Sequence, residues 1–333
     1  MSSSFFQPKL FLILLLNSAC APQIPSENKA IPVEPKKIPT SEMHPQKSKL
    51  KWREVLYEAP WPKSYNFQMF SFRESLWVFH PRGTWKSKDG KVWLKSPLDN
   101  SLGNLAFLDY VTFGESILGL GHFTGNIEQF QFTPKITRTK DGATWETLSE
   151  KSTLPERFFY HPIEFKNKLW IFGGETASGE VSGIWNSSDG IHWKEVESTP
   201  SFGKRGSSQV VAFHDSLYLF NNDIWRSGDG LNWDCVTKKI LPEFDLFGYS
   251  VIVFHDQLWL IGCNRNGLFS SAVGRSRNGV EWVWEEAPWS PRGGVALAVY
   301  ENKLWMTGGK YGGLPNAPNF VYSNDLWALE ESP

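Results

Sequence analysis

The chain has 333 residues with a formal net charge of −1 at pH 7, and acidic and basic side chains are interspersed along it. This balance excludes the basic stripe that nucleic-acid recognition requires, so we expect no nucleic acid partner. Three cysteines in a chain of this length exclude a disulfide framework. Length alone permits two ordinary domains or one large closed β domain.

Residues 1–19 are typical of an export signal, because a short apolar core from residue 10 to 16 runs into Ala19. The core is too short to span a bilayer. The small residue followed by Cys20 resembles the bacterial lipobox, with Asn17 where that motif usually has leucine. The resemblance implies a lipid on Cys20 and a membrane-anchored lipoprotein, periplasmic or at the cell surface. Ordinary signal cleavage, giving a secreted protein, is the alternative.

Prolines recur among Ser, Lys and Glu between residues 20 and 50, without apolar periodicity. Such a segment buries too little surface to offset its ordering entropy, which predicts an extended tether. The folded part then comprises residues 51–333. It contains Cys235 and Cys263, which fall in different repeats, and we expect two buried free thiols there.

A hairpin pattern recurs through the folded part: an aromatic residue, any residue, an acidic or amide residue, a polar residue and two large apolar ones. The short β-rich runs on both sides predict two antiparallel strands joined by a tight turn. The copies lie at residues 72–77, 113–118, 165–170, 213–218, 254–259 and 300–305. Six copies predict six repeating units.

A second hairpin follows five of these copies, with Ser or Thr, any residue, Asp or Asn, Gly, two residues and Trp. Asp-Gly and Asn-Gly favour tight turns with positive φ. The turns lie at residues 87–93, 139–145, 187–193, 227–233 and 276–282. The sixth is split between the two ends of the chain, residues 51–55 and 325–327. We therefore predict an all-β, six-bladed β-propeller closed by the N-terminal strand.

Two second strands end in glycine pairs, at residues 169–174 and 304–309, and Asn324 to Trp327 matches a third strand. These features resemble kelch repeats in a divergent form, of the kind found in galactose oxidase-like propellers. The Ser-x-Asp-Gly-x-x-Trp turns are also similar to the Asp-box of sialidase-like propellers, with one residue fewer between Asp and Gly.

Most of the conspicuous residues have a structural explanation. The tryptophan that ends each second hairpin recurs at one place, so we expect it to pack between neighbouring blades. The Asp or Asn of each turn is expected to bond backbone rather than to act chemically. Two histidines, His80 and His122, fall in neighbouring blades without a third ligand, so we expect no metal.

Propellers usually carry their function where second-to-third strand loops meet the loops between blades. Three arginines that precede inner strands either clamp a carboxylate or phosphate at a central channel or bond loop carbonyls, and both interpretations stay open. The long loops at 121–134, 174–182, 262–272 and 308–320 are the expected variable elements. The candidate ligand-binding residues are Arg157, Arg205, Arg292, His80, His122, Glu175, Asn221, Asn264, Lys310 and Tyr311.

Two classes of function remain, because propellers host many unrelated ones. The interpretation we favour is a monomeric, non-catalytic module without a cofactor that binds a protein or glycan at the cell envelope. The alternative, which the resemblances imply, is a carbohydrate-active enzyme such as a sialic-acid epimerase (mutarotase) or a sialidase-like hydrolase. A copper radical oxidase needs a cysteine at the channel, whereas Cys235 belongs to an outer strand.

Overall fold

The computed structural model describes residues 50–65, 67–96, 109–126, 129–176, 178–265, 268–313 and 318–331. The expected signal, Cys20 and nearly all of the tether lie outside these ranges. Within them the regular secondary structure consists of strands. No helix in this part of the chain is long and apolar enough to cross a membrane.

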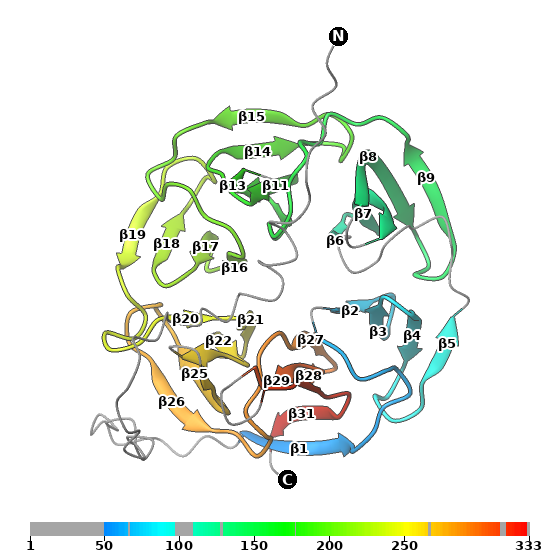
Figure 1. The fold of residues 1–333 in the computed structure, drawn as a ribbon, viewed down its shortest axis with the longest axis vertical. Helices are drawn as coiled ribbons and strands as arrows, with labels where there is room; N and C mark the ends of the chain where they lie inside the picture. The colour runs from blue at the N-terminus through cyan, green and yellow to red at the C-terminus, as the bar shows by residue number, and fades with distance from the viewer. Residues whose placement is uncertain are drawn as a thin grey trace.

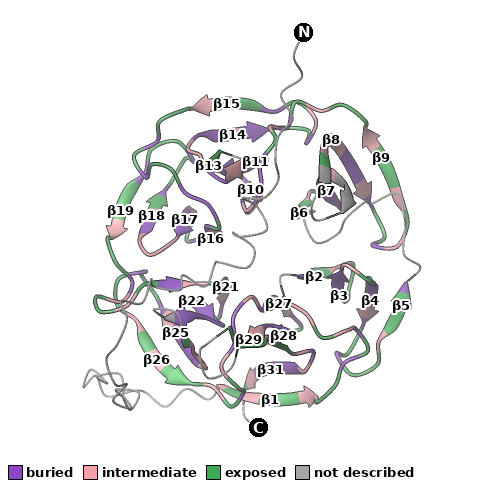
Figure 2. Ribbon diagram, in the orientation of Figure 1, coloured by how far each residue is buried: buried purple, intermediate pink, exposed green. Residues whose placement is uncertain are grey.

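Six four-stranded antiparallel sheets are arranged in a ring, each with its first strand innermost (Figures 1 and 2). Blade 1 is β2 (Gln68–Phe72), β3 (Ser75–His80), β4 (Gly83–Ser87) and β5 (Leu94–Ser96). Blade 2 is β6 (Asp109–Phe113), β7 (Ser116–Asn126), β8 (Gln129–Thr139) and β9 (Trp145–Ser149). Blade 3 is β10 (Ile163–Phe165), β11 (Lys168–Phe172), β14 (Ile184–Ser187) and β15 (Lys194–Glu197).

The second half of the ring repeats this plan. Blade 4 is β16 (Gln209–Phe213), β17 (Ser216–Phe220), β18 (Ile224–Ser227) and β19 (Asp234–Thr237). Blade 5 is β21 (Ser250–Phe254), β22 (Gln257–Ile261), β25 (Ala272–Ser276) and β26 (Val283–Glu286). Blade 6 is β27 (Ala296–Tyr300), β28 (Lys303–Thr307), β31 (Leu326–Glu331) and β1 (Leu50–Leu56). The predicted all-β, six-bladed propeller is therefore confirmed.

The N-terminal strand closes the ring as the outermost strand of blade 6. β1 pairs antiparallel with β31, from Leu50 opposite Glu331 to Leu56 opposite Leu326. An ion pair of 2.9 Å between Arg53 and Glu330 spans the same two strands. The first and last strands thus share one sheet, which leaves no blade unfinished.

The inner hairpins turn with two residues in the left-handed region, as type I′ turns require. Lys166 and Asn167, for example, have φ of 51° and 58°, and four other inner turns have the same pair of positive angles. The outer hairpins differ from our expectation, because only their glycine has positive φ. Their Asp or Asn acts instead as a hydrogen-bond acceptor.

The core lies between the blades (Figure 2). One buried cluster combines Leu118 and Leu120 of blade 2 with Leu169 and Ile171 of blade 3, and Trp193 completes it. The tryptophans that end the other outer hairpins make equivalent contacts with the preceding blade; Trp233, for example, packs edge-on against Phe172 at 5.0 Å. The expectation that these tryptophans pack between blades is confirmed.

Two expectations are corrected. Segments that we expected as loops form additional strand pairs: β7 and β8 are both extended to 11 residues. The shorter ones are β12 (Glu175–Thr176), β13 (Gly179–Glu180), β20 (Leu246–Phe247), β23 (Asn264–Arg265), β24 (Leu268–Phe269), β29 (Lys310–Tyr311) and β30 (Val321–Tyr322). No disulfide joins the two cysteines of the ring, but Cys235 is exposed on β19 and only Cys263 is buried.

Candidate functional site

The ring has two edges, defined by the direction of the inner strands. The turn edge carries the tight turns of the inner and outer hairpins. The loop edge carries the starts of the inner strands, the ends of the second strands and the short additional strand pairs. All ten candidate ligand-binding residues belong to the loop edge or to the strand ends beside it.

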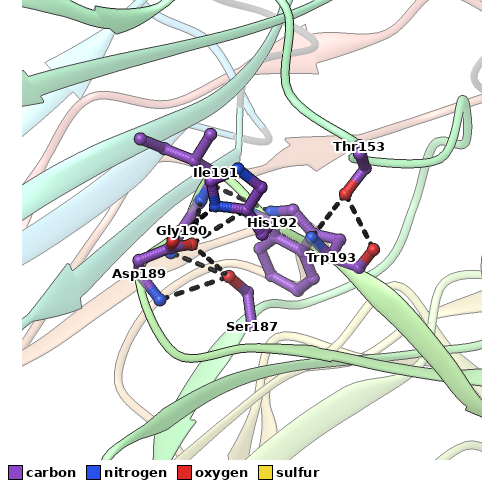
Figure 3. A network of polar contacts seen from close by, with 7 residues as sticks. All are labelled: Thr153, Ser187, Asp189, Gly190, Ile191, His192 and Trp193. Carbon is purple, nitrogen blue, oxygen red and sulfur yellow. Dashed lines mark hydrogen bonds and ion pairs between the residues drawn. The ribbon is translucent and has the colours of Figure 1, made fainter.

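Polar side chains on the turn edge bond their own backbone (Figure 3). Ser187 Oγ accepts the N–H of Gly190 at 2.8 Å, and Asp189 Oδ1 accepts the N–H groups of Ile191 and His192 at 2.8 Å each. The same set of bonds forms in all five outer turns. Burial acts to raise the pKa of Asp189, but the hydrogen bonds from His192 outweigh it and the pKa is lowered. The Ser or Thr hydroxyl and the Asp or Asn oxygen of each outer turn therefore stabilise the turn itself.

Two of the candidate arginines form buried ion pairs with an aspartate at the start of a third strand. Arg205 lies 3.0 Å from Asp223 Oδ1, and Trp225 Nε1 donates to the other oxygen of that carboxylate at 2.7 Å. Arg292, with 3% of its surface exposed, pairs with Asp325 at 2.5 Å, and the indole of Trp327 completes the same arrangement. Each guanidinium is held inside its own blade.

Arg157 occupies the equivalent position in blade 3, but Gly183 stands where blades 4 and 6 have aspartate. Its guanidinium donates to the Gly173 carbonyl at 2.7 Å and lies 5.5 Å from the ring of Trp185. Burial lowers the pKa of Arg157, while the charges of Tyr160 and Glu195 oppose this. The described contacts therefore keep the three arginines in three separate blades, as the carbonyl-bonding interpretation expects, and do not bring them together.

Two candidate histidines lie on neighbouring second strands: His80 is the last residue of β3, and His122 lies within the extended β7. His80 is 2% exposed, accepts the Arg82 N–H on Nδ1 at 3.0 Å, and packs against Phe67. Burial and the charge of Arg82 lower the pKa of His80 to about 4. Burial also lowers the pKa of His122, whose Nδ1 has no hydrogen-bond partner among the residues that the structure describes. Within the described ranges, no group of three or more His, Cys, Asp or Glu side chains could hold a metal ion.

The remaining polar candidates have mixed surroundings. Asn221 accepts the Asn222 N–H on Oδ1 and donates from Nδ2 to the Gly206 carbonyl, so both ends of its side-chain amide are hydrogen-bonded within the protein. Asn264 is buried, and its Oδ1 has no hydrogen-bond partner within the described ranges. Glu175 accepts from Ser207 at 3.4 Å, and burial together with the charge of Glu180 raises its pKa.

An inner ring of residues lies at the start of the six inner strands and was not predicted from the sequence. Each lies four positions before the aromatic residue of the hairpin pattern, and that spacing could have identified them. The members are Gln68, Asp109, His161, Gln209, Ser250 and Ala296, and all except the alanine are polar. Several bond the next blade: Gln68 accepts the Tyr110 N–H at 3.2 Å, and Ser250 donates to the Val295 carbonyl at 2.7 Å.

Three members of this ring, Asp109, His161 and Gln209, lie in blades 2 to 4 and, together with Tyr160, form what we call the polar arc. His161 and Gln209 are hydrogen-bonded across two blades at 3.1 Å. Burial, and then the charge of Asp109, raises the pKa of the Tyr160 hydroxyl, so that carboxyl lies close to it. Burial raises the pKa of Asp109 to about 8 and lowers that of His161 to about 4. The arc therefore contains a carboxyl whose pKa is raised and an imidazole whose pKa is lowered, so burial disfavours the charged form of both groups.

A lysine–aromatic cluster lies over blades 5, 6 and 1 and consists of Tyr65, Lys310, Phe320 and Tyr322. The Lys310 ammonium is 4.1 Å from the ring centre of Tyr65 and 4.7 Å from that of Phe320. Tyr322 stacks on Tyr65 at 5.7 Å. Tyr311 extends the cluster, because its ring lies 5.9 Å from Phe269 of blade 5. Burial lowers the pKa of Lys310.

Fold and edges together define a six-bladed propeller whose two edges differ in chemistry. The profile of the family described as the DUF6242 beta propeller domain matches residues 139–308, which are 170 of the 333 residues. The chain belongs to this family.

Two further proteins resemble parts of the chain. The solved structure of YjhT has a TM-score of 0.64 at 12% sequence identity, over 82% of this chain and 96% of that one. At this identity the likeness shows the fold alone. The leucine-zipper-like transcriptional regulator 1 homolog of Drosophila melanogaster is 26% identical over 147 residues, which cover 38% of this chain and 14% of that protein. The chain thus spans a small part of that relative.

Proposed function

We propose that this chain is a partner-binding propeller that recognises a protein or glycan through its loop edge. The observation that supports this is the contrast in hydrogen bonding between the two edges. Outer turns bond their own backbone, whereas Asn264 Oδ1, Ser208 Oγ and His122 Nδ1 on the loop edge are buried without a partner among the described residues. Buried polar atoms without partners cost free energy, which a ligand would offset.

The resemblance to kelch repeats and to the lipobox extends the proposal to location. A lipid on Cys20 would anchor the chain, and the proline-rich tether to residue 50 would hold the ring away from the membrane surface. The partner is then a component of the cell envelope. Labelling with a radioactive fatty acid, in the wild type and in Cys20→Ser, tests the anchor independently of any ligand.

A binding screen against a glycan array and a panel of small carboxylic acids tests the loop edge. The test variants His161→Ala and Gln209→Ala remove the hydrogen bond between blades 3 and 4. The matched control is His192→Ala, an exposed histidine on the turn edge. We expect any ligand found to be lost in the first two variants and retained in the control. A ligand that survives both loop-edge substitutions and is lost with His192 would contradict the proposal.

A specific observation supports a second candidate, the carbohydrate-active enzyme. Burial raises the pKa of Asp109, whose charge acts on the Tyr160 hydroxyl, and a carboxyl with a raised pKa is suited to general acid catalysis. The resemblances imply proton transfer on a sialic acid or hydrolysis of its glycosidic bond. Nuclear magnetic resonance of anomer exchange and a fluorogenic sialoside assay test this. Turnover abolished in Asp109→Asn would support the enzyme, and equal turnover with and without protein would exclude these two reactions.

A further inference from the structure

We propose that the lysine–aromatic cluster is a docking site for a protein segment that presents an acidic side chain between aliphatic ones. The inference rests on the proposed binding role of the loop edge and deepens it by stating the partner's chemistry. Three properties of the cluster support it. Lys310 has no ion-pair partner among the described residues, the ring of Tyr65 is already covered by Lys310 and Tyr322, and the cluster lies where three blades meet.

Lys310 is a half-buried cation without a counter-ion. No carboxylate in the described ranges lies within ion-pair distance of its ammonium group, whereas Lys303 on β28 pairs with Glu330 at 2.6 Å. Its described contacts are the faces of Tyr65 and Phe320. Removing an ammonium group from water costs free energy that ring contacts offset only in part. A partner carboxylate would offset the remainder, because it also brings acceptors for the ammonium hydrogens.

The ring faces and the flanks favour a peptide over a sugar. A sugar ring stacks on an open aromatic face, but Tyr65 has Lys310 on its ring and Tyr322 stacked against it. The exposed side chains of this part of the loop edge include two aliphatic ones: Val321, next to Tyr322 on β30, is 63% exposed, and Leu268, next to Phe269 on β24, is 60% exposed. Exposed aliphatic side chains beside a cation match an acidic residue with apolar neighbours.

The backbone holds the cluster in place. Lys310 exchanges two hydrogen bonds with Gly293, of 2.9 and 3.0 Å, and β29 pairs with β30. Ser64 bonds Ser323, which fixes Tyr65 beside Tyr322. A platform fixed by strand pairing loses little conformational entropy on binding, so it suits recognition of a flexible segment.

A display library of random short peptides, selected on the purified full-length protein, tests the inference. We expect selection of Asp or Glu next to Leu, Ile or Val. A synthetic peptide from the selected set should bind at least tenfold more weakly when its acidic residue is replaced by the amide. Lys310→Met, which keeps the apolar stem, should weaken binding by a similar factor. Lys88→Met, an exposed lysine on the turn edge, is the matched control and should bind as the wild type does.

Three outcomes would overturn the docking site: a selected set without acidic residues, equal binding of acid and amide peptides, or unchanged binding to Lys310→Met. Thermal unfolding of each variant shows that the fold is retained. The proposed function is tested separately by the glycan screen. A glycan ligand lost with His161→Ala or Gln209→Ala would still support the loop edge as a binding surface, even if the peptide selection overturned the docking site for an acidic segment.

Discussion

The turn edge and the loop edge are built from the same six repeats, yet they treat polar side chains in opposite ways. At the turn edge Ser227 and Asp229 bond backbone, and the N–H of Asn232 contributes most to lowering the pKa of Asp229. At the loop edge Asp109 is partly buried, and burial raises its pKa to about 8. The surroundings of Asp229 therefore stabilise a carboxylate, and those of Asp109 destabilise one.

Repetition separates the two roles. The outer turns carry nearly the same residues in every copy, because each must make the same bonds. At the inner ring the residue changes from blade to blade: Gln68, Asp109, His161, Gln209 and Ser250. The repeated polar residues of the outer turns therefore serve the fold, whereas the varied residues of the inner ring do not share one structural role.

The arginines test this distinction on the loop edge itself, because they repeat in three blades. Arg292→Ala leaves the Asp325 carboxylate, which is largely buried, without its cation. Breaking a buried ion pair from one side costs about 3–5 kcal/mol. We expect a loss of that size in urea-induced unfolding and no effect on ligand recognition.

Arg157→Ala is the matched control for Arg292→Ala. Its guanidinium is equally buried but has no carboxylate within ion-pair distance among the described residues, and its described polar contact is the Gly173 carbonyl. We expect a smaller loss, about 1–3 kcal/mol, from one hydrogen bond and some packing. A loss equal to that of Arg292→Ala would show that the ion pairs of blades 4 and 6 add nothing to the stability of the ring.

Glycine at the turn edge provides the next largest effect. Gly90 has φ of 73°, and a Cβ there would lie 2.1 Å from the Trp305 ring of blade 6. Gly90→Ala therefore adds a left-handed backbone penalty to a clash between blades, about 3 kcal/mol together. Gly114→Ala also has positive φ, 55°, but nothing lies within 4 Å.

The comparison of these two alanine variants isolates the contact between blades. We expect Gly114→Ala to cost only about 1 kcal/mol, measured by chemical denaturation under the same conditions. Equal losses would mean that Trp305 moves aside freely and that the packing of blade 6 against blade 1 tolerates an added methyl group.

Periodicity predicted the fold because each hairpin repeats its own signals. The aromatic and apolar residues of 213–218 and the Asp-Gly of 229–230 are local features, and the split blade followed from matching 51–55 to an outer strand. The candidate site was harder to predict, because the surroundings of a side chain there depend on which partner residue its blade lacks. Nothing local distinguishes Arg157 from Arg205; the difference arises from Gly183, which stands where blade 4 has Asp223.

The clusters of the loop edge were likewise invisible to local patterns. Lys310 and Tyr311 were named from their place after a second strand, but Tyr65 and Phe320 come from segments far apart in the sequence. Asp109 looked like an ordinary strand start. Its raised pKa follows from burial where blades 2 and 3 meet, which no spacing within one repeat reports.

Asp109 also gives the smallest and most direct test of the contrast between the edges. Its folded-state pKa is raised to about 8, so the native state keeps a proton that the unfolded state releases above its ordinary pKa. The wild type therefore loses stability as pH rises through this window. Asp109→Asn removes that loss, and we expect its melting temperature to exceed that of the wild type by roughly 1–3 °C at pH 8.5, with the difference shrinking towards pH 4.

The control with the opposite sign is Asp229→Asn at the turn edge, where asparagine is tolerated because Asn278 makes the same bonds in blade 5. The lowered pKa of Asp229 gives stability above its unfolded pKa that is lost on acidification. This variant should therefore melt below the wild type at neutral pH and approach it in acid. Parallel pH profiles for the two variants would show that the edges do not differ in how they treat a carboxylate.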